Sequence, residues 1–324
     1  MTLVRKIGLA ISALTAAATA VDGRPVRQAS AEASSASPLR TLTWVVDYEP
    51  SWSPTGRHIV LISSRHGGMK VHVLDALSAN HGSDARQLTT GDAEDDSPAW
   101  SPDGRQIAFV SVRDGVQHIF VMAADGAGVT QLTRGPGENI HPAWSPDGSR
   151  ILFNTTHFAA ADQRSGKNVP SDNHVIGEKI DEAMELATIR PDGSDLRRIT
   201  TGGGYTYASF SPDGQSIVLR RIRGASSQVF VMNRDGSGSR NVSGDATLDG
   251  WPAWSPDGER IVFARHTARG LQIFVMNRDG SRVRQLTDAI GEYTNPRWSP
   301  DGTQILCSRR LGDVNLILFP APAR

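Results

Sequence analysis

One short motif recurs six times in this chain and constrains its fold more than any other feature. The motif reads Trp-Ser-Pro-Asp-Gly with small variations, and its aromatic residue is found at Trp52, Trp100, Trp144, Phe210, Trp254 and Trp298. The successive spacings are 48, 44, 66, 44 and 44 residues. A repeat of this length is typical of propellers, in which each copy is one unit packed against its neighbours.

Each copy continues with the same pattern of apolar runs and turns. Residues 106–111 and 119–122 illustrate two alternating runs, and an Asp-Gly turn then leads to a short Gln-Leu-Thr segment such as 131–133. In the repeated turn, Pro fixes φ and Gly supplies the positive φ that closes the hairpin. The sequence therefore predicts an all-β fold, a six-bladed β-propeller of four-stranded antiparallel blades.

The two ends of the propeller region predict how the ring closes. The sixth copy ends after residues 314–319 and has no Gln-Leu-Thr segment, whereas residues 40–43 match that segment ahead of the first copy. We expect the amino-terminal strand to complete the last blade, because this arrangement removes both open sheet edges.

The amino terminus has the features of a secretory signal peptide. Arg5 and Lys6 precede an apolar run that ends in the small-residue sequence Ala-Thr-Ala at residues 18–20. This pattern predicts a signal peptide over 1–20 and a periplasmic or otherwise exported protein. A membrane anchor is the alternative, but such a span needs about 20 strongly apolar residues. We expect a flexible lead-in over 21–38, the propeller over 39–324 and no later membrane-spanning segment.

Composition and missing motifs exclude several functions. Lys plus Arg and Asp plus Glu both number 34, so net charge gives no basis for nucleic-acid binding. One Cys excludes a disulfide framework and a Cys-based zinc site. The usual nucleophile-elbow, zinc-protease and phosphate-loop motifs are absent from the sequence. We expect a monomer without cofactor or metal, and binding rather than catalysis.

The repeated phrases Pro-Ala-Trp-Ser-Pro-Asp-Gly, Phe-Val-Met-Asn-Arg-Asp-Gly and Gln-Leu-Thr resemble the propeller of the TolB family, periplasmic proteins of the Tol-Pal envelope system. The resemblance covers residues 39–324. TolB carries an α/β domain before its propeller, whereas only about 18 residues separate the expected cleavage site from the first strand here, so contacts made through that domain are not implied. The resemblance implies an envelope binding or scaffold protein, with a protein partner such as a Pal-like lipoprotein.

A propeller enzyme is the alternative, because oligogalacturonate lyase has similar repeats. Such a lyase needs a base and a cation beside a uronic acid, and tyrosines, histidines and arginines of this chain are available for those roles. The His-rich carboxy-terminal metal cluster of that family has no match after His266.

Side chains that differ from copy to copy gather just before the six aromatic residues. In order, they are Asp47, Glu49, Asp95, Asp96, Asn139, His141, Tyr205, Tyr207, Asp249, Trp251, Tyr293 and Asn295. The loops at this end of the blades share one face, and the turns on the opposite face are chemically uniform. Variation between copies is typical of a binding surface. We therefore predict that the ligand or partner binds at the channel mouth on the face where these variable residues lie, opposite the uniform turns.

Three arginines occupy equivalent positions in consecutive copies. Arg221, Arg265 and Arg309 each lie eleven residues past the aromatic residue, and His266 follows the second. We predict an arc of guanidinium groups that binds a carboxylate, a phosphate or an acidic saccharide. The alternative is that each Arg pairs with a neighbouring acid and only solvates the rim.

The 66-residue spacing predicts an insertion of about 22 residues in the third copy. The insertion contains His157, Asp172, His174 and Glu178. We predict that it forms a lid or partner-contact loop over the channel mouth. His141, His157 and His174 are candidates for a shared metal, but three His at irregular spacing do not make a zinc motif, and we predict no metal site.

Overall fold

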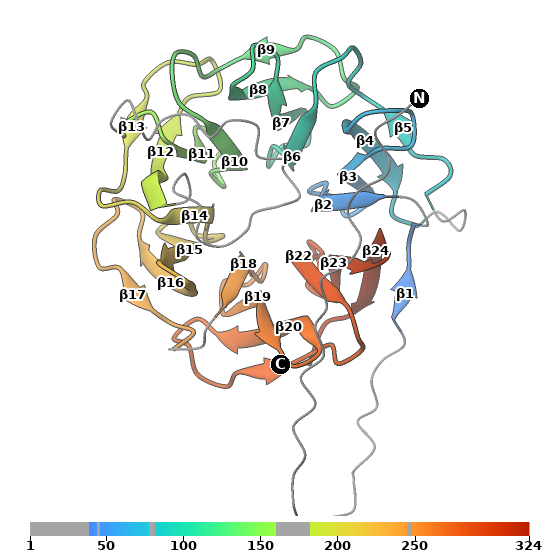
Figure 1. Cartoon of the computed structure of the whole chain (residues 1–324), viewed down its shortest axis with the longest axis vertical. Coiled ribbons are helices and arrows are strands. Elements are labelled where there is room, and N and C mark those ends of the chain that lie inside the picture. The colour runs from blue at the N-terminus through green and yellow to red at the C-terminus, as the bar shows by residue number, and fades with distance from the viewer. Residues whose placement is uncertain (1–38, 44–45, 78–81, 160–181, 245–247, 324) are drawn as a thin grey trace, which may run out of the picture. The chain divides into compact units, whose positions relative to one another are not determined.

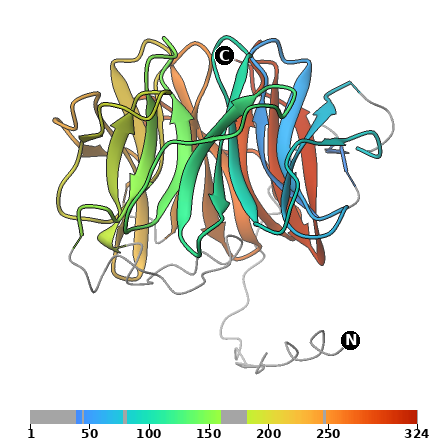
Figure 2. The ribbon, with the colours of Figure 1, turned by 90° about the horizontal axis from the view of Figure 1, so that it is seen from above.

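Six four-stranded sheets surround a central channel (Figure 1). In this computed structural model, the described residues are 39–43, 46–77, 82–159, 182–244 and 248–323. All strand pairs within the blades are antiparallel, and in side view the strands run along the channel (Figure 2). The predicted all-β, six-bladed architecture is confirmed. The predicted signal peptide and lead-in lie outside the described residues.

The blades follow one another along the chain. Blade 1 contains β2 (Asp47–Trp52), β3 (His58–Ser63), β4 (Lys70–Asp75) and β5 (Arg86–Gln87); blade 2 contains β6 (Asp95–Trp100), β7 (Gln106–Val112), β8 (Gln117–Ala123) and β9 (Thr130–Gln131). Blade 3 contains β10 (Asn139–Trp144), β11 (Ile151–Thr155), β12 (Glu185–Ile189) and β13 (Arg197–Arg198); blade 4 contains β14 (Tyr205–Phe210), β15 (Ser216–Arg223), β16 (Ser226–Asn233) and β17 (Arg240–Asn241). Blade 5 contains β18 (Asp249–Trp254), β19 (Arg260–Thr267), β20 (Gly270–Asn277) and β21 (Arg284–Gln285); blade 6 contains β22 (Glu292–Trp298), β23 (Gln304–Leu311), β24 (Asp313–Pro320) and β1 (Arg40–Thr41).

Blade 6 joins the two ends of the propeller. Strand β1 pairs with β24, with Arg40 opposite Leu318 and Thr41 opposite Ile317. Beyond this ladder, Leu42 donates its backbone N–H to the Leu316 carbonyl at 2.8 Å. The predicted closure by the amino-terminal strand is therefore confirmed.

The Gln-Leu-Thr motif extends an outer strand that is only two residues long. In blade 2, Leu132 donates its N–H to the Ile119 carbonyl at 2.8 Å, and Thr133 Oγ1 accepts the Ile119 N–H at 2.9 Å. Hydroxyls of Thr43, Thr89, Thr200, Ser243 and Thr287 accept the equivalent bond in the other blades. The hydroxyl replaces a backbone acceptor where the ladder ends.

The Ser-Pro-Asp-Gly turns join each blade to the next. Ser101 Oγ donates to Asp103 at 2.6 Å and accepts the N–H of Gln106 at 2.9 Å. Gly104 has a φ of +71°, and a Cβ there would lie 3.6 Å from the Pro54 ring of the preceding blade. Gly56 meets Pro300 in the same way across the closure. We call these six Pro-Gly contacts the turn ring, and the end of the propeller that carries them the turn face.

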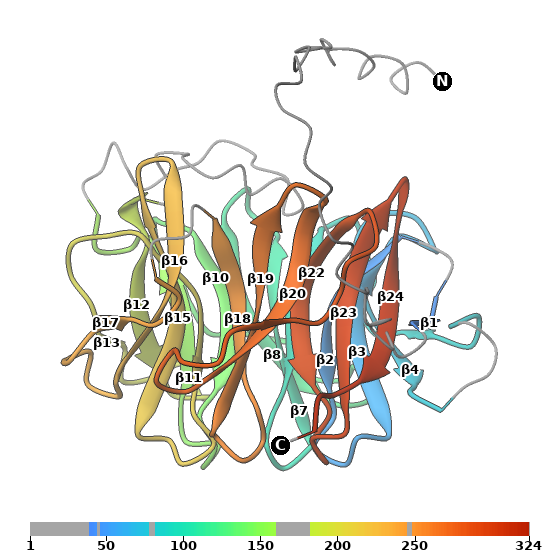
Figure 3. The same cartoon turned by 90° about the horizontal axis from the view of Figure 1, so that it is seen from below.

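The core consists of apolar layers between adjacent blades. One layer joins Val110 and Ile119 of blade 2 to Phe153 and Ile189 of blade 3. The central hairpins of blades 4 to 6 have eight-residue strands, whereas β11 and β12 have five residues each. The longer hairpins of blades 4 and 6 reach furthest on the face opposite the turns (Figure 3).

Candidate functional site

Every innermost strand has a β-bulge at the same place. In β10 the pairing register shifts between Ile140 and Ala143, and the other five innermost strands shift at equivalent positions. The first bulged residue has a left-handed φ of 48° to 51° in all six copies, at Glu49, Ser97, His141, Tyr207, Trp251 and Asn295. We call these six residues the channel ring. A bulge redirects a side chain, and a left-handed non-glycine residue costs about 1–2 kcal/mol.

Channel-ring side chains from neighbouring blades contact one another. The His141 and Tyr207 rings stack with centroids 3.8 Å apart, and the Tyr207 and Trp251 centroids are 5.5 Å apart. Asn295 Nδ2 donates to Glu49 Oε1 at 3.4 Å across the closure between blades 6 and 1. The bulge thus brings side chains of neighbouring copies together at the floor of the channel, His141 with Tyr207 and Trp251, and Asn295 with Glu49.

Glu49 has an unsatisfied acceptor in this floor. The residue is 9% exposed, and no described group donates a hydrogen bond to its buried Oε2. A buried carboxylate oxygen without a donor is costly, so such a group in a native cavity calls for an explanation.

A cavity of about 350 Å³ extends from the channel ring to the turn face. Five channel-ring residues line it, all except Trp251. Its walls contain prolines and indole rings, together with turn prolines such as Pro102 and Pro256. The small residues that follow the bulge leave this space, namely Ser51, Ala99, Ala143, Ser209 and Ala253. The cavity therefore lies on the turn side of the ring, whereas the sequence predicted a site on the opposite face.

Arg297 is the exception among those small wall residues. It occupies the position of Ala253 and its equivalents in blade 6, and it lines the cavity half-buried. Its Nη1 donates to the Pro296 carbonyl at 3.0 Å. Burial lowers the pKa of the Arg297 guanidinium, and the nearby carboxylate of Glu49 partly offsets this effect. Arg297 was not predicted from the sequence, although Pro-Arg-Trp in place of Pro-Ala-Trp marks it.

Arg220 is a second charged residue near the channel ring that was not predicted from the sequence. It is 1% exposed, and its guanidinium carbon lies 5.4 Å from the Trp251 ring centroid and 6.0 Å from that of Tyr207. A Cβ on Gly250 would lie 3.2 Å from Arg220 Cδ, so the glycine leaves room for the arginine stem. The available signal was a second arginine directly before Arg221, between the apolar residues 217–219 and Ile222.

Tyr207 is an acid that stays protonated. Burial raises the pKa of its phenol well above the ordinary value, and the Glu49 carboxylate adds to the rise. At neutral pH its hydroxyl is therefore a hydrogen-bond donor and not a base.

The residue two places before each channel-ring residue does not line the cavity. These residues are at most 6% exposed, and they are Asp47, Asp95, Asn139, Tyr205, Asp249 and Tyr293. Asp47 accepts a hydrogen bond from Arg65 Nη2 at 2.7 Å, while burial raises the pKa of the Asp47 and Asp95 carboxyls. Asp96, the second residue of its strand, is also buried, and its Oδ1 accepts the Ser97 N–H at 2.7 Å.

The three arginines predicted to form an arc are held by their own blades. Arg265 Nε and Nη2 bind the Asp249 carboxylate at 2.7 and 2.8 Å, as the pairing alternative expects. The guanidinium carbon of Arg221 lies 4.6 Å from the Tyr205 ring centroid, and that of Arg309 lies 5.4 Å from the Tyr293 centroid. None of the three lines the cavity, and His266 is exposed on β19.

Blade 3 departs from the repeat near the insertion. A second cavity of about 390 Å³ is lined by His157, Arg134, Phe153 and Ile189, at the interface with blade 2. The predicted lid residues Asp172, His174 and Glu178 lie outside the described residues. Within the described part of the chain, no group of three His, Cys, Asp or Glu side chains is arranged to hold a metal ion.

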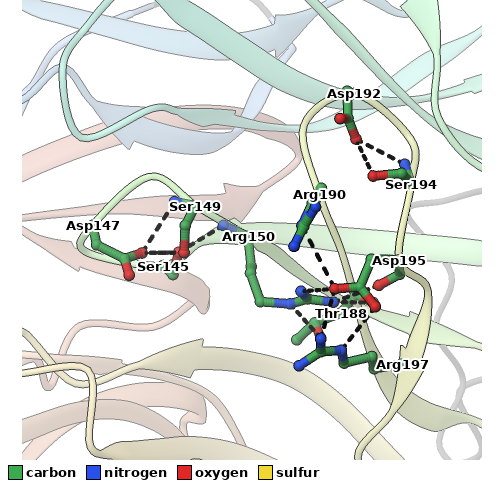
Figure 4. Close-up of polar contacts among 10 residues, drawn as sticks. All are labelled: Ser145, Asp147, Ser149, Arg150, Thr188, Arg190, Asp192, Ser194, Asp195 and Arg197. Carbon is green, nitrogen blue, oxygen red and sulfur yellow. Dashed lines mark hydrogen bonds and ion pairs between the residues drawn. The ribbon is translucent and has the colours of Figure 1, made fainter.

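An ion-pair cluster holds the outer edge of blade 3 (Figure 4). Asp195 contacts Arg150 Nη1 and Arg197 Nη2, both at 2.8 Å, and Arg190 Nε at 3.5 Å. Hydrogen bonds from Arg197 and Arg150 lower the pKa of the Asp195 carboxyl to about 2. Since all these groups belong to blade 3 and Arg150 is buried, the cluster is a structural support for that blade.

Comparisons with known proteins identify the repeat. The family model described as the TolB beta propeller domain matches residues 41–169 and 239–317, more than half of the chain. A protein described as TolB from Agrobacterium tumefaciens is 23% identical, with a TM-score of 0.64 over 88% of this chain and 94% of that one. TolB from Acinetobacter baumannii is 18% identical, with a TM-score of 0.59 over 85% of this chain and 63% of that one.

Enzymes share the same fold. An oligogalacturonate lyase in complex with manganese is 16% identical, with a TM-score of 0.59 over 90% of this chain and 94% of that one. At this identity the likeness shows the fold alone. No curated protein sequence matches the chain. Among the described residues, no helix has the length and apolar character needed to cross a bilayer.

Proposed function

The chain belongs to the TolB β-propeller family, and we propose that it is an exported, non-enzymatic binding protein of the cell envelope. Its ligand, or a segment of its protein partner, occupies the cavity above the channel ring. The signal-peptide pattern of residues 1–20 supports export. The family likeness supports a protein partner, for which a Pal-like lipoprotein is one candidate.

The unsatisfied Oε2 of Glu49 is the observation that carries this proposal. An acceptor that is buried at the floor of a cavity favours an occupant that brings a donor to it. The rest of the floor differs in every blade, while the surrounding backbone is the same. Structural needs alone explain the repeated bulge but not six different side chains at one position.

An anionic group of the occupant is expected at Arg297. Its guanidinium lines the cavity and offers several donors beyond the one bound to Pro296. The arginines that were predicted for this role contact Tyr205, Asp249 and Tyr293 instead. We therefore expect the anionic group to contact Arg297 at the wall of the cavity, and not the three arginines of the predicted arc.

The lyase alternative has less support from the site. A lyase needs a base next to its substrate, and Tyr207, which faces the cavity, has a raised pKa that keeps it protonated. His141 also lines the cavity and offers an imidazole, so the alternative is tested directly. Acidic polysaccharides are incubated with the mature protein, and the absorbance of unsaturated products is followed.

A capture experiment tests the binding function. Mature protein, residues 21–324, is immobilised and exposed to envelope extract beside a Glu49→Gln/Arg297→Gln double variant. We expect a partner or ligand that the wild type retains and the double variant loses, with no lyase product from either. Equal retention by both proteins would exclude the cavity, and product formation that requires His141 would establish the enzyme.

A further inference from the structure

We infer that the cavity binds a zwitterion, an α-amino acid whose ammonium group contacts Glu49 and whose carboxylate contacts Arg297. This inference rests on the proposed binding function and names its ligand class. It starts from two opposite charges that border one cavity. Glu49 belongs to its floor in blade 1, and Arg297 belongs to its wall in the adjacent blade 6.

The two charged groups do not satisfy each other. No ion pair within 4 Å or hydrogen bond joins Glu49 to Arg297, although both line the same space. Glu49 receives only the Asn295 amide on Oε1, and Arg297 donates only to its neighbouring carbonyl at Pro296. One acceptor and several donors therefore remain available to an occupant.

Charge balance decides between ligand classes. Among the described residues that line the cavity, Glu49 is the one carboxylate and Arg297 the one guanidinium. A simple anion would pair with Arg297 and leave Glu49 Oε2 buried without a donor, and a simple cation would leave Arg297 with only the Pro296 carbonyl as acceptor. Because an uncompensated buried charge is strongly destabilising, a ligand that carries both charges fits best. Charge-assisted hydrogen bonds at both ends would then be made together.

The remaining walls describe the side chain of the ligand. They consist of prolines and aromatic rings, including Pro142, Trp144 and Trp254. A cavity of about 350 Å³ is at the small end of ligand sites, which suits one amino acid rather than a long peptide. An apolar or aromatic side chain would lie along these walls toward the turn face.

Capped analogues test the two charges separately. Binding of L-phenylalanine to the mature protein is measured by calorimetry, beside N-acetyl-L-phenylalanine and L-phenylalanine amide. The first analogue lacks the ammonium group and the second lacks the carboxylate. We expect L-phenylalanine to bind, and each analogue to bind at least tenfold more weakly, because each leaves one of the two charged side chains of the cavity without its ligand partner.

Two substitutions assign each charge to its residue. Glu49→Gln should weaken L-phenylalanine binding and reduce its preference over the N-acetyl analogue, since Gln still accepts a hydrogen bond but carries no charge. Arg297→Gln should also weaken L-phenylalanine binding, and it should reduce the preference for L-phenylalanine over the amide analogue. Arg221→Gln, a matched loss of a guanidinium outside the cavity, should leave all three affinities unchanged. Melting curves check that the variants fold, and the wild-type analogue series decides the question if they do not.

The outcomes separate this inference from the function on which it rests. Equal binding of the capped analogues, or binding of galacturonate without L-phenylalanine, would overturn the zwitterion. If L-phenylalanine does not bind but capture from envelope extract still requires Glu49 and Arg297, the inference fails and the binding function stands. If neither depends on these two residues, both fail.

Discussion

The turn ring and the channel ring are built on the same sixfold backbone but use it differently. In the turn ring, a Pro of one blade contacts a Gly of the next at all six positions. In the channel ring, six residues share one left-handed conformation and carry six different side chains. The turn ring joins blades, so its residues are fixed by packing. Five of the six channel-ring residues line a cavity, where packing between blades does not fix the side chain, so these positions are free to differ and to bind.

Opening the ring should have the largest effect on stability. Deleting residues 21–43 removes β1 and the fully buried Leu42, and leaves β24 with an open edge. We expect a loss greater than the ~2–5 kcal/mol of a buried Leu→Ala change, measured as the free energy of unfolding. Deleting 21–38 alone is the control and should change little. Equal melting of both truncated proteins would contradict closure by β1.

The ion pair of Arg265 should show that the predicted arc is structural. Arg265→Gln leaves the fully buried Asp249 carboxylate without its bidentate partner, and should cost about 3 kcal/mol in the free energy of unfolding. Arg221→Gln removes cation–π contacts with Tyr205 and Phe230 but breaks no ion pair, and should cost less than the loss of the Arg265 ion pair, about 1 kcal/mol. A more stable Arg265→Gln protein would mean that the arginines repel one another, as a ligand-binding arc requires.

Adding a side chain in the turn ring and removing one in the channel ring should change the free energy of unfolding in opposite directions. Gly104→Ala in the turn ring forces a side chain into a φ of +71° beside Pro54, and should cost about 1–2 kcal/mol. Ser97→Gly in the channel ring relieves a φ of +48°, and should raise stability by about 0.5–1 kcal/mol. Chemical denaturation of both variants checks this pair. Destabilisation by Ser97→Gly would show that the serine itself packs as tightly as the turn-ring residues.

Lowering the pH from ~4 toward 2 should remove the stability that the Asp195 ion pairs give to the outer edge of blade 3. The pKa of Asp195 is lowered to about 2 from an ordinary 3.8, so its contribution to stability is complete above pH ~4 and is lost as pH falls toward 2. Asp195→Asn should therefore lower the melting temperature at pH 6, and the difference from wild type should shrink below pH 4. A constant difference across this range would contradict the ion-pair cluster.

The fold was predictable because its determinants repeat. Six copies of the turn and the displaced Gln-Leu-Thr segment predicted both the blade number and the pairing of Arg40 with β24. The structure explains why those motifs repeat: the hydroxyl accepts the same hydrogen bond in every blade, and each turn glycine lies beside a proline ring of the preceding blade.

The site was predictable only in part, because it depends on where each bulge lies. Five channel-ring residues were named from the sequence, together with the buried residues two places before them. A bulge shifts the alternation of side chains by one residue, and strand periodicity alone does not locate it. Ser97 was missed beside the more conspicuous Asp95 and Asp96. A residue directly before Pro was the available signal in five of six copies.

The central claim is that the channel ring and its cavity, rather than the opposite face, bind the partner or ligand. The most direct test is the dissociation constant of the captured partner for two double variants. We predict that Glu49→Gln/Arg297→Gln weakens binding at least tenfold, because it removes both charged contacts of the cavity, while Arg221→Gln/Arg309→Gln leaves binding unchanged. The reverse result, with binding lost only in the second variant, would contradict this account and place the site on the face that carries the three arginines.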